Sequence, residues 1–235
     1  NAVAMGRQAG QTSQGASATA VGFQAGNSEQ GADATAVGRE AGKTSQGDYT
    51  VAVGRYAGYN AQVDDATAIG HAAGQISQGS KSVAVGRAAG YEAQAANATA
   101  VGYGAGQTSQ GTNAAALGDR AGQVSQGTQA VAVGYLAGQS DQGGRGVAVG
   151  REAGKIAQSE YSIAVGHTAG MTSQGENAQA IGANSGRDSQ LAEAVAVGYG
   201  AGMTAQGSAS VAVGQTAGQY NQATLSVAVG REAGQ

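Results

Sequence analysis

The sequence of 235 residues predicts an all-β fold, a repetitive β-solenoid (β-roll) of about fifteen coils of sixteen residues each. Three observations predict this fold class. The chain repeats every sixteen residues without an insertion, each repeat contains one short valine-rich run, and glycines recur at fixed places after that run. Residues 1–235 are therefore expected to form a single repeat array, which we expect to be a segment of a longer chain.

The repeat itself is strict at a few positions and variable at the others. We number its positions from 1 to 16, beginning at Asn1, and the consensus is x-A-V-A-V-G-x-x-A-G-Q-T-S-Q-G-x. Position 4 is always Ala, positions 6 and 10 are always Gly, position 14 is always Gln, and position 9 is Ala except at Ser185. Identity at matching places within one chain indicates that the repeats are structurally equivalent.

The run A-V-A-V-G predicts the first strand of each coil. It is short, rich in β-branched residues and ends on glycine, whereas two glycines per repeat would each cost a helix about 1 kcal/mol relative to alanine. Side chains alternate across a strand, so the valines at positions 3 and 5 share one face and the alanines at positions 2 and 4 share the other. We expect the valines to face the coil interior and the alanine face to pack against another chain.

The rest of the repeat predicts two turns and a second strand. G-x-x-A-G is typical of a turn, because glycine adopts backbone angles that other residues resist, and Q-T-S-Q follows as a short strand. Coils stacked about 4.8 Å apart would form a rod on the order of 70 Å long. The glycine columns expected to shape the turns are Gly6, Gly22 and Gly38 at position 6 and Gly10, Gly26 and Gly42 at position 10.

The invariant glutamine at position 14 predicts a ladder of amides. Identical amides one strand spacing apart can hydrogen-bond along the stack, as Asn and Gln ladders do in cross-β assemblies. The residues expected in this ladder include Gln14, Gln30, Gln46, Gln62, Gln78, Gln94 and Gln110.

Position 15 carries a second, longer periodicity. It is glycine except at five places, all in even-numbered repeats: Val63, Ala95, Ser159, Leu191 and Ala223. Either the array grew by duplication of pairs of repeats, or one full coil contains two repeats with unlike faces.

Composition limits the possible function classes. Bulky aliphatic residues are few and Phe23 is the only phenylalanine, which leaves a small core for a lone solenoid. We therefore expect a closed self-association, a parallel homotrimeric fibre. The net charge of −3 gives no basic stripe for nucleic acid, and no apolar stretch reaches membrane-spanning length. We expect no nucleic-acid partner and no membrane insertion in this segment.

Several motifs suggest chemistry that their context does not support. G-R-E-A-G-K-T at residues 38–44 has three residues between its glycines, whereas a phosphate-binding loop needs four. His71 and His167 share position 7 but are six repeats apart, and the acidic pair Asp64-Asp65 does not recur as it does in calcium-binding solenoids. We expect no catalytic residues, no metal site and no cofactor, and hence no enzyme.

Tyrosines occupy only variable positions, which predicts that they lie on the outside. Exposed aromatic side chains can stack on sugars or anchor protein contacts. The candidate surface contacts are Tyr59 and Tyr91 at position 11, and Tyr103, Tyr135 and Tyr199 at position 7.

Two strings in the repeat carry a resemblance to known families. S-V-A-V-G, followed by small-residue turns, is similar to the head repeats of trimeric autotransporter adhesins, the YadA-like left-handed β-roll. The fuller A-V-G-x-x-A-G-x-x-S-Q-G resembles repeats in fibre and adhesin-like proteins of phages and large algal or protist viruses. The resemblance covers the whole chain, although adhesin head repeats are shorter than the sixteen residues found here. It implies a trimeric stalk or head on a cell or virion surface that functions in attachment.

The sequence thus favours a structural fibre shaft or adhesin-like protein that supports attachment to a host or surface. The expected partners are further copies of the chain and an unknown host receptor or glycan, and the expected location is extracellular, on a virion fibre or cell surface. Two alternatives stay open. One is an ice-binding solenoid, which needs a regular threonine array, whereas position 3 is threonine only at Thr19, Thr35, Thr67 and Thr99. The other is a functional amyloid subunit, suggested by the glutamine column.

Overall fold

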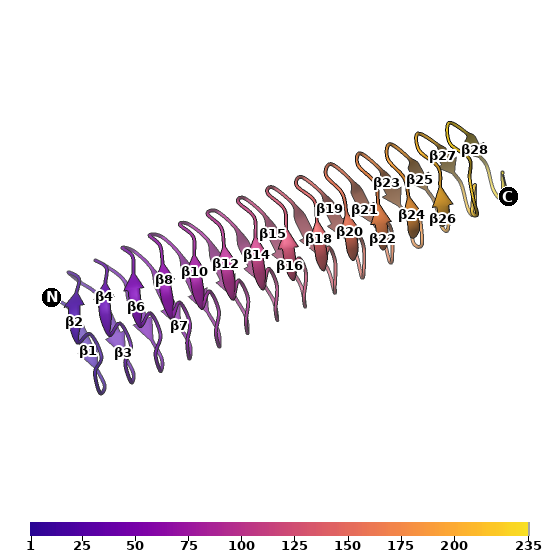
Figure 1. Ribbon diagram of the computed structural model, residues 1–235. Helices are drawn as coiled ribbons and strands as arrows, with labels where there is room; N and C mark the ends of the chain where they lie inside the picture. Colours follow the sequence, from indigo (N-terminus) through magenta and orange to yellow (C-terminus); the bar gives the residue numbers. More distant parts are fainter. Residues whose placement is uncertain (235) are drawn as a thin grey trace. The chain divides into compact units, whose positions relative to one another are not determined.

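The computed structural model describes residues 1–234 and confirms the predicted fold class, a β-solenoid of stacked sixteen-residue coils. Each strand pairs in parallel with its counterpart in the following repeat, as in Val3↔Thr19 and Gln14↔Gln30 (Figure 1). A full coil is therefore one repeat and not two. Contacts divide the chain into two compact units, Asn1–Leu117 and Gly118–Gln235, which are described in turn.

Two parallel sheets run through the first unit. The strands at positions 3–5 form the Val sheet: β1 (Val3–Met5), β3 (Thr19–Val21), β5 (Thr35–Val37), β7 (Val51–Val53), β9 (Thr67–Ile69), β11 (Val83–Val85), β13 (Thr99–Val101) and β15 (Ala115–Leu117). The strands at positions 12–14 form the Gln sheet: β2 (Thr12–Gln14), β4 (Ser28–Gln30), β6 (Thr44–Gln46), β8 (Asn60–Gln62), β10 (Ile76–Gln78), β12 (Glu92–Gln94) and β14 (Thr108–Gln110).

The second unit repeats the same two sheets. Its Val sheet contains β17 (Val131–Val133), β19 (Val147–Val149), β21 (Ile163–Val165), β23 (Gln179–Ile181), β25 (Val195–Val197), β27 (Val211–Val213) and β28 (Val227–Val229). Its Gln sheet contains β16 (Val124–Gln126), β18 (Ser140–Gln142), β20 (Ile156–Gln158), β22 (Thr172–Gln174), β24 (Asp188–Gln190) and β26 (Thr204–Gln206).

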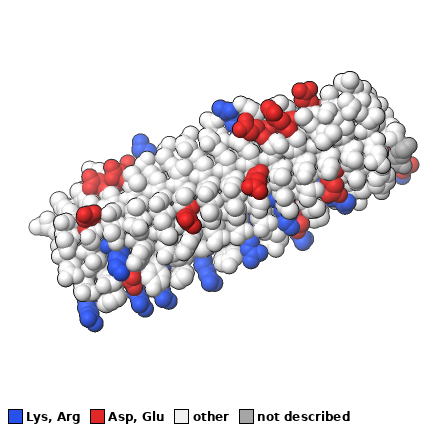
Figure 2. All heavy atoms as spheres, in the orientation of Figure 1, with Lys and Arg blue, Asp and Glu red and all other residues white. Residues whose placement is uncertain are grey.

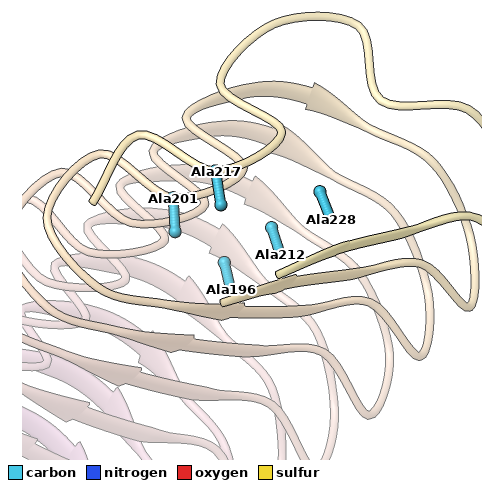
Figure 3. Close-up of a cluster of buried hydrophobic side chains, with 5 residues drawn as sticks. All are labelled: Ala196, Ala201, Ala212, Ala217 and Ala228. Atoms are coloured by element: carbon cyan, nitrogen blue, oxygen red, sulfur yellow. The ribbon is translucent and has the colours of Figure 1, made fainter. Parts of the chain in front are cut away.

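The coil interior is lined by alanine, which corrects the expected orientation of the strands. Alanines at positions 2, 4 and 9 are buried, and in the second unit those at positions 4 and 9 face one another across the coil (Figure 3). Among the described residues, Leu136 is the only buried apolar side chain larger than alanine. The alanine face therefore packs within its own coil and not against another chain.

The valines point outward because the interior is too narrow for them. A Cβ placed on Gly10 would lie 2.6 Å from the Gln14 Oε1 atom and 3.2 Å from the Ala4 Cβ atom, so the glutamine side chain and the alanine methyl already fill the space. A branched side chain inside would force a packed interior apart. The prediction that valine faces inward is therefore wrong.

Left-handed backbone conformations at three non-glycine positions bend each coil closed. In one coil Ser77, Lys81 and Ala88 have φ values of 54°, 56° and 55°, and similar values recur at positions 13, 1 and 8 of other described coils. Position 13 lies in the middle of the Gln strand, so Ile76 and Gln78 pair with the next coil while Ser77 does not. Such conformations are unfavourable for single L-residues, and they persist here because the register of every coil imposes them.

Candidate interaction surface

The glutamine column lies inside the coils and joins the two sheets. In the middle of the first unit, the Gln78 Nε2 atom donates to the backbone oxygen of Thr67 at 2.8 Å in the opposite sheet and to that of Ser82 at 3.5 Å. Its Oε1 atom accepts from the Gln62 Nε2 atom at 3.1 Å. The column thus combines amide–amide contacts along the stack with amide–backbone contacts across it, which satisfies polar groups in a buried position.

The amide-to-amide contacts occur in runs and not along every step. Such bonds, at 3.0–3.3 Å, include those that join residue 46 to 62, 62 to 78, 94 to 110, 126 to 142, 158 to 174, 174 to 190 and 190 to 206. Within the described residues, the Oε1 atoms that lack a donor belong to Gln30, Gln46, Gln94, Gln158 and Gln222. The Gln14 amide donates to the backbone of Val3 at 2.9 Å and of Ala18 at 3.3 Å. The backbone contacts are therefore the more regular part of the column.

The glycine columns are required by close approach as well as by backbone angle. Gly6 has a φ of 129°, and a Cβ there would lie 2.6 Å from the carbonyl oxygen of Gly22 in the next coil. The same geometry recurs at Gly22 and Gly38, and Gly26 and Gly42 repeat the contact of Gly10 with the glutamine amide. These residues shape the coil.

The outer face of the Val sheet is an apolar surface that nothing in the described chain covers. Position 5 of its strands is exposed by 40% at Ile69, 36% at Val101 and 39% at Ile181, and most other side chains at positions 3 and 5 are half-buried. We call the outward side chains at these two positions the Val face. Contiguous exposed apolar surface is typical of interaction sites in proteins.

One of the two turns is basic. We call positions 6–11 of the coils the basic edge, which in the first unit carries Glu40 and the five cations Arg7, Arg39, Lys43, Arg55 and Arg87. Guanidinium groups stack on aromatic rings along it. Phe23 lies between Arg7 and Arg39, at 6.0 and 5.8 Å from the ring centroid, and Arg87 lies 5.7 Å from that of Tyr103.

The opposite turn is acidic. We call positions 15, 16 and 1 the acidic edge, which in the first unit carries Lys81 and four anions, Asp33, Asp48, Asp64 and Asp65. In the second unit the acidic edge carries Glu160, Glu176 and Glu193 against Arg145. Figure 2 shows most of the basic side chains along one edge, and acidic side chains along the other edge and on the face between them. The two edges therefore differ in charge, and four further acids, Glu29, Glu92, Asp141 and Asp188, lie in strands of the Gln sheet.

The predicted tyrosines lie on the surface but do not form one site. Tyr103, Tyr135 and Tyr199 are exposed on the basic edge, by 43%, 43% and 57%. Tyr135 is stacked by Arg151, with 5.9 Å between guanidinium and ring centroid. Tyr59 and Tyr91 are half-buried at position 11 and lie two coils apart.

The densest side-chain cluster surrounds Tyr59 and includes the lysine of the G-R-E-A-G-K-T motif. The Lys43 ammonium contacts the Glu40 carboxylate at 3.1 Å and the Tyr59 hydroxyl at 3.3 Å, and it lies 5.2 Å from the tyrosine ring centroid. Tyr56 packs edge-on against Tyr59, with centroids 5.8 Å apart, and against His71 at 6.2 Å. Lys43 is thus held by its neighbours and does not face a phosphate cradle.

Two titratable groups in this cluster are shifted. Burial alone would raise the pKa of Glu40, but the hydrogen bonds and charges of Lys43 and Arg39 outweigh it and lower the pKa below its ordinary value of 4.5. The hydrogen bond that the Lys43 ammonium donates to Glu40, opposed by burial and reinforced by Tyr59, raises the pKa of Lys43 above 10.5. Both groups therefore remain charged near neutral pH.

The other candidate chemical groups are dispersed or engaged in the fold. The Asp64 carboxylate accepts from the backbone nitrogen of Asp48 at 3.0 Å, which ties one coil to the next, and His167 is exposed at position 7. Within residues 1–234 no cluster of three or more His, Cys, Asp or Glu side chains could hold a metal ion. A shallow hollow on the acidic edge is lined by Gly143, Ser159, Glu160 and Glu176.

Sequence reasoning missed the Val face, the segregated edges and the cluster around Tyr59. A signal for the edges exists in the sequence, since ten of the twelve Lys and Arg residues occupy positions 7–11 of the repeat. The cluster had no such signal, because Tyr56 and His71 are brought to Tyr59 only by the coil geometry.

The chain matches no protein-family model, and no curated protein matches its sequence. Over the described part of the chain, no helix is long and apolar enough to cross a membrane. The β-solenoid of sixteen-residue coils is what the structure establishes.

Proposed function

We propose that the chain is the structural shaft of an extracellular fibre, on a virion or cell surface, that supports attachment and assembles as a parallel homotrimer. One observation carries this proposal. The interior positions 4, 9 and 14 are the same in nearly every coil and position 2 is always Ala, Ser, Thr or Gly, whereas the outward positions 7, 11 and 16 change from coil to coil. Such a pattern maintains a rigid repeating scaffold without repeating any catalytic site.

The backbone supports a mechanical role. Each coil is bonded to the next at several points, for example from Val3 N to Ala18 O at 2.9 Å, from Thr12 N to Asn27 O at 2.9 Å and from Gly15 N to Gln30 O at 2.7 Å. In solenoids each repeat contacts only its neighbours, so stability grows with the number of repeats. A shaft of this kind resists extension and proteolysis because no flexible loop separates its described coils.

The basic edge supports a role in attachment. Exposed tyrosines stacked by arginine, such as Tyr103 with Arg87, offer an aromatic face and a cation to a host receptor or glycan. This recognition role and the absence of enzyme activity are parts of the proposal.

Mass and shape in solution test the proposal. We expect light scattering to give three times the 22.6 kDa chain mass, and electron microscopy to show thin rods that survive protease treatment. A monomer that melts above about 60 °C, the upper part of the usual range for single domains, would contradict the trimer. A flexible chain without rod shape that proteases degrade readily would contradict the shaft.

An ice-binding solenoid is the second candidate. Thr19 and Thr35 lie on paired strands, at position 3 of the Val sheet, and their side chains are half-exposed on its outer face. Thermal hysteresis in the purified chain would favour this candidate, and seeded growth with dye binding would favour the amyloid alternative.

A further inference from the structure

We propose that the Val face is the surface on which copies of this chain associate, and that the copies run parallel, with the basic edge of one copy against the acidic edge of the next. The inference rests on the proposed parallel self-association and names its surface and the pairing of its charged edges, neither of which follows from the shaft alone. It reverses the expectation that alanine forms the contact between chains.

The first argument is the location of the bulky apolar side chains. The interior is built from alanine and glutamine, so the aliphatic side chains of the strands are left outside. In the first unit the Val face carries only apolar residues and threonine, and in the second unit its one polar member is Gln179. A second copy would remove from water the apolar surface that the fold leaves exposed.

The second argument is area. A stripe two side chains wide, about 10 Å, with one coil about every 4.8 Å, presents about 50 Å² per coil. Eight strands in the first Val sheet and seven in the second give a total of roughly 700 Å², close to the ~800 Å² per partner of a standard stable interface. The flanking edges add to this area, so the face is large enough to hold two copies together.

The third argument is charge. Along each coil the acidic edge precedes the Val strand and the basic edge follows it, so the two edges flank the Val face on opposite sides. In the first unit these are four anions with one cation, and five cations with one anion. In the second unit the basic edge holds Arg120, Arg151, Lys155, Arg187 and Arg231 with three acids, Asp119, Glu152 and Glu232.

Symmetry then selects the direction. If the rotation axis runs along the stack of coils, the basic edge of one copy meets the acidic edge of its neighbour, in a dimer or in a trimer. If two copies instead pack face to face in antiparallel directions, acid meets acid and base meets base. Like charges juxtaposed across an interface disfavour the wrong arrangement, so the edges favour the parallel one.

Matched lysine substitutions on the two sheets test the surface. Val101 and Ile181 are exposed by 36% and 39% on the Val face, and Val124 and Ile156 are exposed by 40% and 45% on the outside of the Gln sheet. We expect V101K/I181K to lower the mass by light scattering to that of one chain, whereas V124K/I156K retains the wild-type mass. Circular dichroism of both variants confirms the fold.

Thiol crosslinking in the otherwise unchanged chain tests the direction, because the chain contains no cysteine. Thr35→Cys places one thiol on the Val face in the third coil, and Ser28→Cys places one on the Gln sheet nearby. In a parallel assembly equivalent thiols on the Val face meet, so a short bis-maleimide should join most T35C chains and few S28C chains.

The outcomes separate this inference from the proposed function. An assembly that survives V101K/I181K, or that crosslinks through S28C and not T35C, would overturn the inference and leave the shaft proposal standing. A wild-type chain that is monomeric would overturn both. Loss of thermal hysteresis in V101K/I181K, without a change of mass, would assign the face to ice and not to a second copy.

Discussion

Replacing Gln190 by alanine should destabilise its coil more than any surface change can. Its side chain is fully buried. Its Nε2 atom donates to the backbone oxygens of Gln179 at 2.8 Å and Ala194 at 3.0 Å and to the Gln206 Oε1 atom at 3.1 Å. Its Oε1 atom accepts from Gln174 at 3.2 Å. The substitution removes all four hydrogen bonds at once.

The expected cost follows from these contacts. Each hydrogen bond contributes about 1 kcal/mol net, and the space left by the amide adds roughly 1 kcal/mol. We therefore expect the free energy of opening of this coil to fall by about 4–5 kcal/mol. Since about 1.4 kcal/mol corresponds to a factor of ten, amide hydrogen exchange around β24 should accelerate about a thousandfold.

Native-state hydrogen exchange is the assay, because a solenoid can open locally. Gln190→Met serves as one control, since it retains the approximate volume of the side chain and removes only the amide. It should lower the free energy of opening by most of the amount that Gln190→Ala does. Gln215→Ala, at an exposed position of the same unit, should change stability by less than about 0.5 kcal/mol. Equal effects of Q190A and Q215A would refute the reasoning.

Three further changes test the coil. Gly198→Ala should cost more than about 3 kcal/mol in chemical denaturation, because φ is 128° and its Cβ would lie 2.6 Å from the carbonyl oxygen of the next coil. Gly200→Ala, at a φ of 62° with no backbone atom in the way, should cost only about 1–2 kcal/mol. Ala164→Val should cost about 1–3 kcal/mol by overpacking the interior, whereas Val165→Ala, on the half-exposed face, should cost less. The opposite ranking of the two costs would indicate that valine, and not alanine, faces the interior. Glu40→Gln should lower the melting temperature at about pH 7, and the difference from wild type should shrink as the pH falls below 4.5, because the stabilisation from a lowered pKa is lost when the folded-state carboxylate is protonated. A difference that does not shrink in acid would contradict this.

The sequence was sufficient to predict the coil, its period and its two strands. The glutamine at position 14, such as Gln78, is identical in every full repeat and always follows a glycine such as Gly74 by four residues. A position in a ladder along a stack of coils explains this identity. The sequence left open whether one coil contains one repeat or two, and only the pairing of strands decided it. The substitutions of glycine at Val63 and Leu191 could not decide it, because they leave the register unchanged and their side chains are exposed.

The direction of the strand faces could not be predicted by the usual rule that larger apolar residues lie inside. That rule assumes an interior wide enough for a branched side chain. Here Gly10, Gln14 and Ala4 already touch across the coil, and this distance depends on the left-handed residues at positions 1, 8 and 13. Those backbone angles cannot be predicted from composition or periodicity. Residues such as serine, lysine and alanine occupy these positions, and none of them is typical of the left-handed region.

The most direct measurement of the central claim is a distance between two spin labels on one unit. Ser125 and Ser189 are both exposed at position 13 and lie four repeats apart. With cysteines introduced at both sites and labelled chains diluted into unlabelled ones, sixteen-residue coils predict a narrow distribution centred at about 19 Å, four strand spacings. A broad distribution at much longer distance, or a peak at half the predicted value, would contradict the account.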